Sequence, residues 1–139
     1  MNTKIILSTA AGAVFNFLGG WFVFGILLSN FYLANTKTYE GLSKAEMPDL
    51  PFIFLSGIFN AYLANFVIRK AGQGFSFATG FKFGLVVYLC MAAWVNFSVY
   101  AFYNLMNLTL VFTDIFVQAI FGGVTGGIMA LVMGAGKKA

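Results

Sequence analysis

The side chains that could bind a solute or an ion within the apolar parts of this chain are few, and most of them are amides. Asp114 is the only acidic residue inside an apolar run, and Gln118 follows it four positions later. Asn16, Asn60 and Asn96 each lie in a different apolar run. Because polar groups are costly in a bilayer, such residues are candidates for function. The candidate intramembrane polar cluster that we predict is Asn16, Asn60, Asn96, Tyr100, Asp114 and Gln118.

The amides also have an ordinary structural interpretation. An Asn side chain commonly bonds a neighbouring membrane helix, and such a bond is worth about 0.6–2 kcal/mol. No charged residue lies near the middle of an apolar run, so the sequence does not support proton-driven transport. Two interpretations stay open: interhelical bonding, or an interior lined by Asn and Tyr that accepts a neutral or weakly charged solute.

Catalysis would need a nucleophile or a base, and the inventory is short. The chain has no His and one Cys, which removes imidazole chemistry and intramolecular disulfides. Cys90 has no neighbouring His or cation to activate its thiol. Asp114 lacks the second carboxylate that acid–base chemistry usually requires. We therefore expect no enzyme activity, no cofactor and no metal site.

The composition places these residues in a membrane. Apolar residues make up 60% of the chain and charged residues 9%, whereas soluble proteins have about 45–50% and about 25%. A chain of 139 residues has room for several apolar spans, each of about 20 residues. The basic residues lie at the ends of apolar runs rather than in one patch, so we expect no nucleic-acid partner and a lipid bilayer instead.

Four apolar runs predict an all-α fold. We expect one membrane domain, residues 1–139, built as a bundle of four transmembrane helices at about 5–32, 52–70, 81–104 and 110–134. The first run is longer than one span of about 20 residues, so it should tilt or project from the hydrocarbon. The start of the last helix is open: if Thr113 is the cap, Asp114 lies in the first turn. If the helix begins near Thr109, Asp114 lies one turn deeper.

Small residues recur at intervals of four and predict close helix packing. Residues four apart share nearly one helix face, and a row of small side chains lets another backbone approach. The last run carries the longest such row, which should be the packing spine of the bundle. The predicted helix-packing residues are Gly12, Gly20, Gly122, Gly123, Gly126, Gly127, Ala130 and Gly134.

The basic residues predict the orientation. One side of the predicted bundle has Lys4, Arg69, Lys70, Lys82, Lys137 and Lys138, and the other has Lys37, Lys44, Glu40, Glu46, Asp49 and Asp114. The positive-inside rule therefore places both termini in the cytoplasm. We expect a multi-pass protein of the inner (cytoplasmic) membrane.

The order of short motifs resembles a family of small four-helix bacterial integral membrane proteins of unknown function. The motifs are Leu18-Gly19-Gly20-Trp21-Phe22, then Gly41-Leu42-Ser43 with acidic residues, a Gly-rich link, Asn96 to Tyr100, and Asp114 before a Gly-rich helix. The chain departs from the family where Trp-Tyr and a following Pro are expected, because it has Trp21-Phe22 and no Pro there. The resemblance implies the four-helix fold and brings no activity.

Two functions compete on this evidence. The first is a structural or interaction subunit that self-associates, or docks to a larger membrane complex, through the Gly-rich helix faces. The second is a small transporter or channel for a neutral or weakly charged solute, with the Asn and Tyr residues lining its interior.

Overall fold

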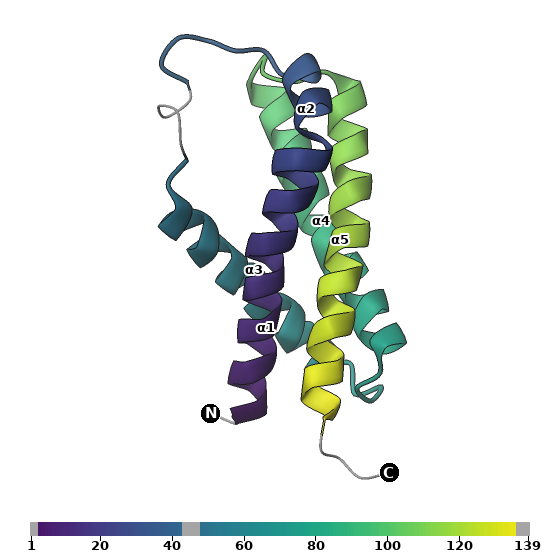
Figure 1. Ribbon diagram of the computed structural model, residues 1–139. Coiled ribbons are helices and arrows are strands. Elements are labelled where there is room, and N and C mark those ends of the chain that lie inside the picture. The colour runs from purple at the N-terminus through teal and green to yellow at the C-terminus, as the bar shows by residue number, and fades with distance from the viewer. Residues whose placement is uncertain (1–2, 43–47, 136–139) are drawn as a thin grey trace.

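A computed structural model describes residues 3–42 and 48–135 of the chain. Its elements are α1 (Thr3–Gly20), the π-helix η1 (Trp21–Leu27), α2 (Ser29–Asn35), α3 (Leu50–Lys70), α4 (Phe77–Phe102) and α5 (Leu108–Gly134), as Figure 1 shows. The described part is all-helical and contains no strand. Four helices, Thr3–Leu27, α3, α4 and α5, are long and apolar enough to cross a membrane. The predicted all-α class is confirmed, and so is the prediction of four helices with the length and composition of membrane spans.

Local sequence explains where the helices begin. Asn107 caps α5, because its Oδ1 accepts a hydrogen bond from the Leu110 N–H at 2.9 Å. Ser76 caps α4 in the same way through the Thr79 N–H, at 3.1 Å. Pro51 occupies the first turn of α3, where its missing N–H costs no helical bond. Of the two starts that the sequence left open for the last helix, the structure has the earlier one, and Asp114 lies in the second turn of α5.

The first apolar run is broken rather than continuous. After α1 the backbone widens into η1, and the Leu28 N–H bonds the Val23 carbonyl oxygen five residues back, at 2.9 Å. Leu28 has a non-helical backbone and separates η1 from α2. Gly25 lies beneath the Trp21 ring, where an added Cβ would come 3.1 Å from Trp21 Cδ1. Where the sequence predicted a single helix at 5–32, the structure therefore has a membrane-length helix, Thr3–Leu27, followed by the separate short helix α2.

Helices α4 and α5 form a closely packed antiparallel hairpin, side by side in Figure 1. Their glycines face each other: a Cβ added at Gly84 would lie 2.9 Å from Gly126 Cα, and one at Gly126 equally close to Gly84 Cα. Real Cβ contacts are essentially never this short. The two backbones touch here because neither helix has a side chain in the way.

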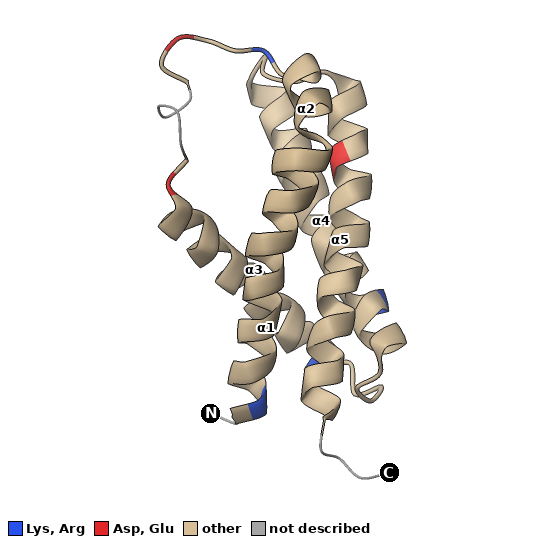
Figure 2. Cartoon of the chain, viewed as in Figure 1, with Lys and Arg blue, Asp and Glu red and all other residues tan. Residues whose placement is uncertain are grey.

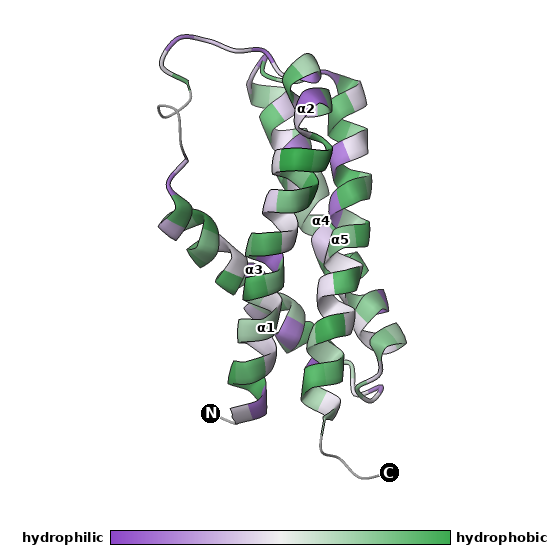
Figure 3. Ribbon diagram, viewed as in Figure 1, coloured by the Kyte–Doolittle hydropathy of each residue, from purple (hydrophilic) through white to green (hydrophobic). Residues whose placement is uncertain are grey.

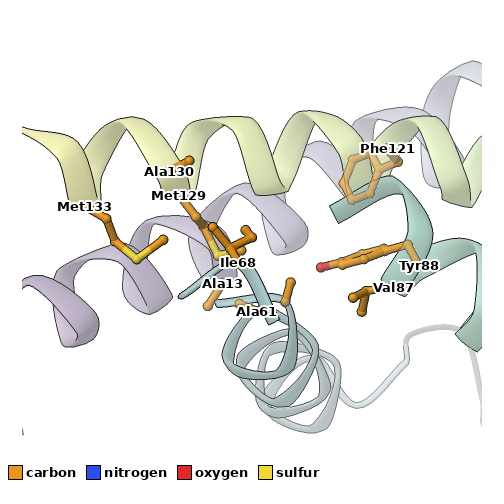
Figure 4. Packing of buried hydrophobic residues seen from close by; sticks show 10 residues of the cluster. Ala13, Ala61, Ile68, Val87, Tyr88, Phe121, Met129, Ala130 and Met133 are labelled. Atoms are coloured by element: carbon orange, nitrogen blue, oxygen red, sulfur yellow. The ribbon is translucent and has the colours of Figure 1, made fainter. Parts of the chain in front are cut away.

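Helix α3 is buried mainly from Gly57 onward, and nearer its start Phe54 contacts the Phe17 ring of α1, with 5.7 Å between ring centroids. The first turns of α3 lean away from the bundle, so that α3 starts near the middle of the bundle's height in Figure 1. The core is a mixture of small and large apolar side chains. Figure 4 labels its members Ala13, Ala61, Ile68, Val87, Tyr88, Phe121, Met129, Ala130 and Met133.

The helices consist mostly of hydrophobic residues, coloured green in Figure 3. Large apolar side chains stand exposed on every long helix, among them Trp94, which is 70% exposed. Such a surface is expected where lipid tails, rather than water, surround the helices.

Charge is divided between the two ends of the bundle (Figure 2). We call the end formed by the start of α1, the end of α3, the start of α4 and the end of α5 the basic end. It carries Lys4, Arg69, Lys70 and Lys82. We call the opposite end, where α2 meets the link between α4 and α5, the loop end. Lys44, Glu46, Lys137 and Lys138, which the orientation argument also used, lie outside the described residues.

Candidate functional site

A central polar layer connects the four long helices. Asn16 of α1 donates from Nδ2 to the Tyr88 hydroxyl of α4 at 2.7 Å and to the Gly57 carbonyl oxygen of α3 at 3.2 Å. Thr125 of α5 donates to Asn16 Oδ1 at 3.0 Å. Figure 4 shows the Tyr88 hydroxyl oxygen pointing into the bundle. One amide therefore touches all three other long helices.

This layer is enclosed and its groups are paired. Thr125 is fully buried and Tyr88 is 7% exposed. No buried side-chain nitrogen or oxygen among the described residues lacks a hydrogen-bond partner. Paired polar groups of this kind fix the register of membrane helices, since each would be costly to leave alone in hydrocarbon.

A second layer lies toward the loop end and contains the carboxylate of Asp114. Asn96 Nδ2 donates to Asp114 Oδ2 at 2.6 Å, and the Tyr32 hydroxyl donates to Asp114 Oδ1. Asn96 also donates to the carbonyl oxygen of Ala92, at 2.9 Å. The acidic layer, as we call Tyr32, Asn96 and Asp114, thus joins α2, α4 and α5.

Two contacts between chain segments place Tyr32 over Asp114. The Lys37 N–H donates to the Leu105 carbonyl oxygen at 2.7 Å, beside an isolated bridge between Thr36 and Met106. Asn107 Nδ2 donates to Asn35 Oδ1, also at 2.7 Å. These bonds pin the end of α2 to the link between α4 and α5, so the tyrosine one turn earlier meets the carboxylate.

The carboxylate of Asp114 forms no ion pair within the described part of the chain. The loop-end cation Lys37 donates instead to Asn104 Oδ1, at 2.7 Å. Burial, and then the hydrogen bond to Asp114, raise the pKa of the Tyr32 phenol above its ordinary value. The phenol therefore stays protonated and remains a donor to the carboxylate.

The six residues of the predicted polar cluster do not form one site. Asn16 belongs to the central layer, whereas Asn96 and Asp114 belong to the acidic layer. Asn60 and Gln118 are half-buried and make no side-chain hydrogen bond to a described residue. Tyr100 is exposed. The described hydrogen bonds therefore divide the predicted residues between two layers, and the functional role of the cluster stays a prediction.

The predicted packing glycines lie in different surroundings. A Cβ at Gly123 would meet the Phe81 ring at 2.8 Å, and one at Gly127 would meet the Phe77 ring, so the row on α5 is covered by α4. Gly122 lies under Tyr88, and Gly134 lies under the Phe75 carbonyl oxygen. The remaining predicted packing residues of α5 and α1, Gly126, Ala130 and Gly12, are buried as well. Gly20 instead has nothing within 4 Å of an added Cβ.

Several residues of these layers were not predicted. Tyr32 lies at the edge of the first run, and no spacing rule links it to Asp114. Thr125 lies between the glycines of the last run and resembles one more small residue. Asn65 forms a third polar group at the basic end, where its Nδ2 donates to Thr9 Oγ1 at 3.1 Å and its Oδ1 accepts from Arg69 Nε at 3.0 Å. The sequence could have identified Asn65 as a candidate, because it is a polar residue within an apolar run.

The fold and these layers define a small helical membrane bundle with paired polar groups between its helices. No family model, curated protein or solved structure matches the chain. The family resemblance therefore stays an expectation.

Proposed function

We propose that the protein is a structural or interaction subunit of a bacterial inner membrane, with both termini in the cytoplasm, which self-associates or docks to a larger membrane complex. The described residues offer one surface suited to this role, an apolar groove between α1 and α3. Its volume is about 470 Å³. The residues that line it are Ile5, Ile6, Thr9, Ala10, Ala13, Val14, Phe54, Ile58, Phe59 and Tyr62.

The groove supports docking because small residues contribute to its α1 side. Ala10 and Ala13 of α1 line it together with the larger side chains of Phe54 and Phe59 on α3. The outward lean of the first half of α3 leaves this side open. A transmembrane helix with small residues of its own could approach α1 closely here, which is how membrane helices associate without a hydrophobic driving force.

The Gly row of α5 is not the docking surface that the sequence led us to expect. Gly122, Gly126 and Ala130 are buried beneath α4 within the chain. The proposed occupant of the α1–α3 groove is therefore a helix of another chain, in the first instance a second copy of this protein.

The proposal is tested by a substitution that fills the groove with a larger side chain. We expect native-detergent sizing of the wild type to show a species larger than the monomer. Ala10→Phe should remove this larger species, because the new ring occupies the space of the incoming helix. Ala101→Phe is the matched control, since Ala101 is exposed on α4 and lies outside the groove. An unaltered size in Ala10→Phe, or an equal loss in both variants, would contradict the docking proposal.

The orientation is tested separately. A reporter fused to the C-terminus should give cytoplasmic signal, because the basic end should face the cytoplasm. Signal on the opposite side would reverse the proposed topology.

A second candidate function, a small transporter or channel for a neutral or weakly charged solute, is favoured by one observation. Asp114 lies within a membrane-length helix, and its bonding partners among the described residues are the neutral donors Tyr32 and Asn96. Such a residue is a functional candidate by default. Solute uptake by reconstituted vesicles should fall in Asn96→Leu and persist in Asn60→Leu, because Asn60 has no side-chain bond in the described structure. Equal uptake by protein-free vesicles would remove this candidate.

A further inference from the structure

The basic end holds a second cavity, with a volume of about 430 Å³. It lies where the end of α3, the link to α4 and the end of α5 meet, and its lining residues are Ile68, Arg69, Gly72, Gly74, Phe75 and Gly134. Because glycine has no side chain, Gly72, Gly74 and Gly134 present only backbone to this space. Gly72 and Gly74 have positive φ angles of 65° and 81°, a conformation that other residues rarely adopt.

Arg69 is held in the wall of this cavity by a buried amide. Its Nε donates to Asn65 Oδ1 at 3.0 Å. Asn65 is fully buried and is itself fixed to α1 through Thr9 Oγ1 and the Ile5 carbonyl oxygen, at 3.1 and 3.3 Å. The Nε edge of the guanidinium is therefore occupied, and its two terminal nitrogens have no acceptor among the described residues. A guanidinium oriented in this way is suited to a planar pair of oxygen acceptors.

The surrounding charge also favours an anion. Lys4 Nζ donates to the Ala135 carbonyl oxygen at 2.6 Å, which brings a second cation to the residue beside Gly134. The described carboxylates, Glu40, Asp49 and Asp114, belong to the loop between α2 and α3 or to the second turn of α5, and none reaches the basic end. Figure 2 shows blue without red in this part of the molecule.

We propose that this cavity binds a phosphate group, carried either by the headgroup of an anionic phospholipid or by a free phosphate ion. The two terminal nitrogens of Arg69 donate to phosphate oxygens, and the ammonium of Lys4 adds a second positive charge at the rim. The glycine backbone on the facing wall leaves room for the tetrahedral group. The end of a membrane helix is where headgroup phosphates are met, and basic residues at that depth attract anionic lipid.

The test measures the shift in Tm of the purified full-length protein in a neutral detergent. The probes are short-chain phosphatidylglycerol, short-chain phosphatidylcholine and inorganic phosphate. A rise with phosphatidylglycerol alone assigns the site to a lipid headgroup, and an equal rise with inorganic phosphate assigns it to the free ion. Either result supports the phosphate site. An equal rise with phosphatidylcholine and phosphatidylglycerol, or no rise with either phosphatidylglycerol or inorganic phosphate, would overturn it.

Variants separate the cavity from the general positive charge of this end. Arg69→Gln should raise the apparent Kd about tenfold for the phosphate-bearing probe that stabilises the wild type, because the substitution removes charge-assisted hydrogen bonds. Lys82→Gln removes the same charge from the same end outside the cavity, where Lys82 lies over the Phe83 ring, and should leave the Kd within about twofold. Equal losses in the two variants would overturn the proposal. If Arg69→Gln does not fold, Arg69→Lys keeps the charge without the planar fork, and an unchanged Kd there would equally overturn it.

Discussion

Asn96 and Asp114 are joined by a hydrogen bond of 2.6 Å between the amide Nδ2 and the carboxylate Oδ2. This contact connects the last third of α4 to the second turn of α5. The other carboxylate oxygen accepts from Tyr32, so both of the polar neighbours of Asp114 are neutral donors. Among the described residues, the acidic layer therefore holds the carboxyl group of Asp114 within a membrane-length helix through hydrogen bonds from neutral groups.

Asp114→Ala should destabilise the bundle more than Asp114→Asn does. Alanine leaves both Tyr32 and Asn96 without their acceptor, and an unsatisfied buried polar group costs about 1–3 kcal/mol. Asparagine keeps one acceptor oxygen at nearly the same position. Reversible unfolding in SDS, followed by circular dichroism, would measure the two losses. Equal losses would show that the donors do not depend on an acceptor at residue 114.

Stability should fall in alkali partly because of Tyr32. The folded state raises the pKa of this phenol above its unfolded value of about 10. Between the two values the folded state holds more protons than the unfolded state, so the contribution is full below pH of about 10 and is lost as pH rises through the folded pKa.

Tyr32→Phe is the control for this pH dependence, because it removes the titrating group and leaves the other tyrosines in place. The unfolding free energy of the wild type should fall more steeply above pH of about 10 than that of Tyr32→Phe. Parallel curves for the two proteins would show that Tyr32 ionises freely in the folded bundle.

Asn16 and Asn60 provide a matched test of the central layer. Asn16→Ala breaks bonds to α3, α4 and α5 at once, whereas the Asn60 side chain makes no bond to a described residue. We expect Asn16→Ala to cost at least about 1–2 kcal/mol, at the upper end of interhelical bonds in membranes. Asn60→Ala should change the free energy of unfolding by less than about 0.5 kcal/mol. Similar losses would mean that the central layer is not a bonded network.

The sequence predicts where the long helices of this fold lie better than it predicts where a helix breaks and which residues meet across helices. Apolar length was enough to find four membrane helices, because hydrocarbon requires every backbone group to be bonded within the helix. The break at Leu28 was not predictable, since no Pro and no charged residue marks it in the sequence. The position of Tyr32 follows from that break.

The row of polar residues on α4 shows why the polar cluster was only partly predicted. Tyr88 and Asn96 lie on the same row and are both buried, but they bond different partners in different layers. Tyr100 continues the row and is exposed, because a spacing of four rotates steadily around the helix. Spacing identifies residues that share a face over two or three turns, and it does not identify which helix that face meets.

Two glycines provide the sharpest test of the packing between α4 and α5. A Cβ at Gly126 would come 2.9 Å from Gly84 Cα, on a backbone that cannot move aside, whereas a Cβ at Gly20 would meet nothing within 4 Å. Gly126→Ala should therefore force α4 and α5 apart and cost about 1–3 kcal/mol, as overpacking does in well-packed cores. Gly20→Ala should be neutral or stabilising by up to about 1 kcal/mol, because alanine favours the helix. Unfolding in SDS would compare the two variants, and native-detergent sizing would show whether Gly126→Ala still forms the larger species. Equal effects on unfolding would contradict the backbone contact. Loss of the larger species without any loss of stability would instead indicate that the Gly row of α5 is the docking surface.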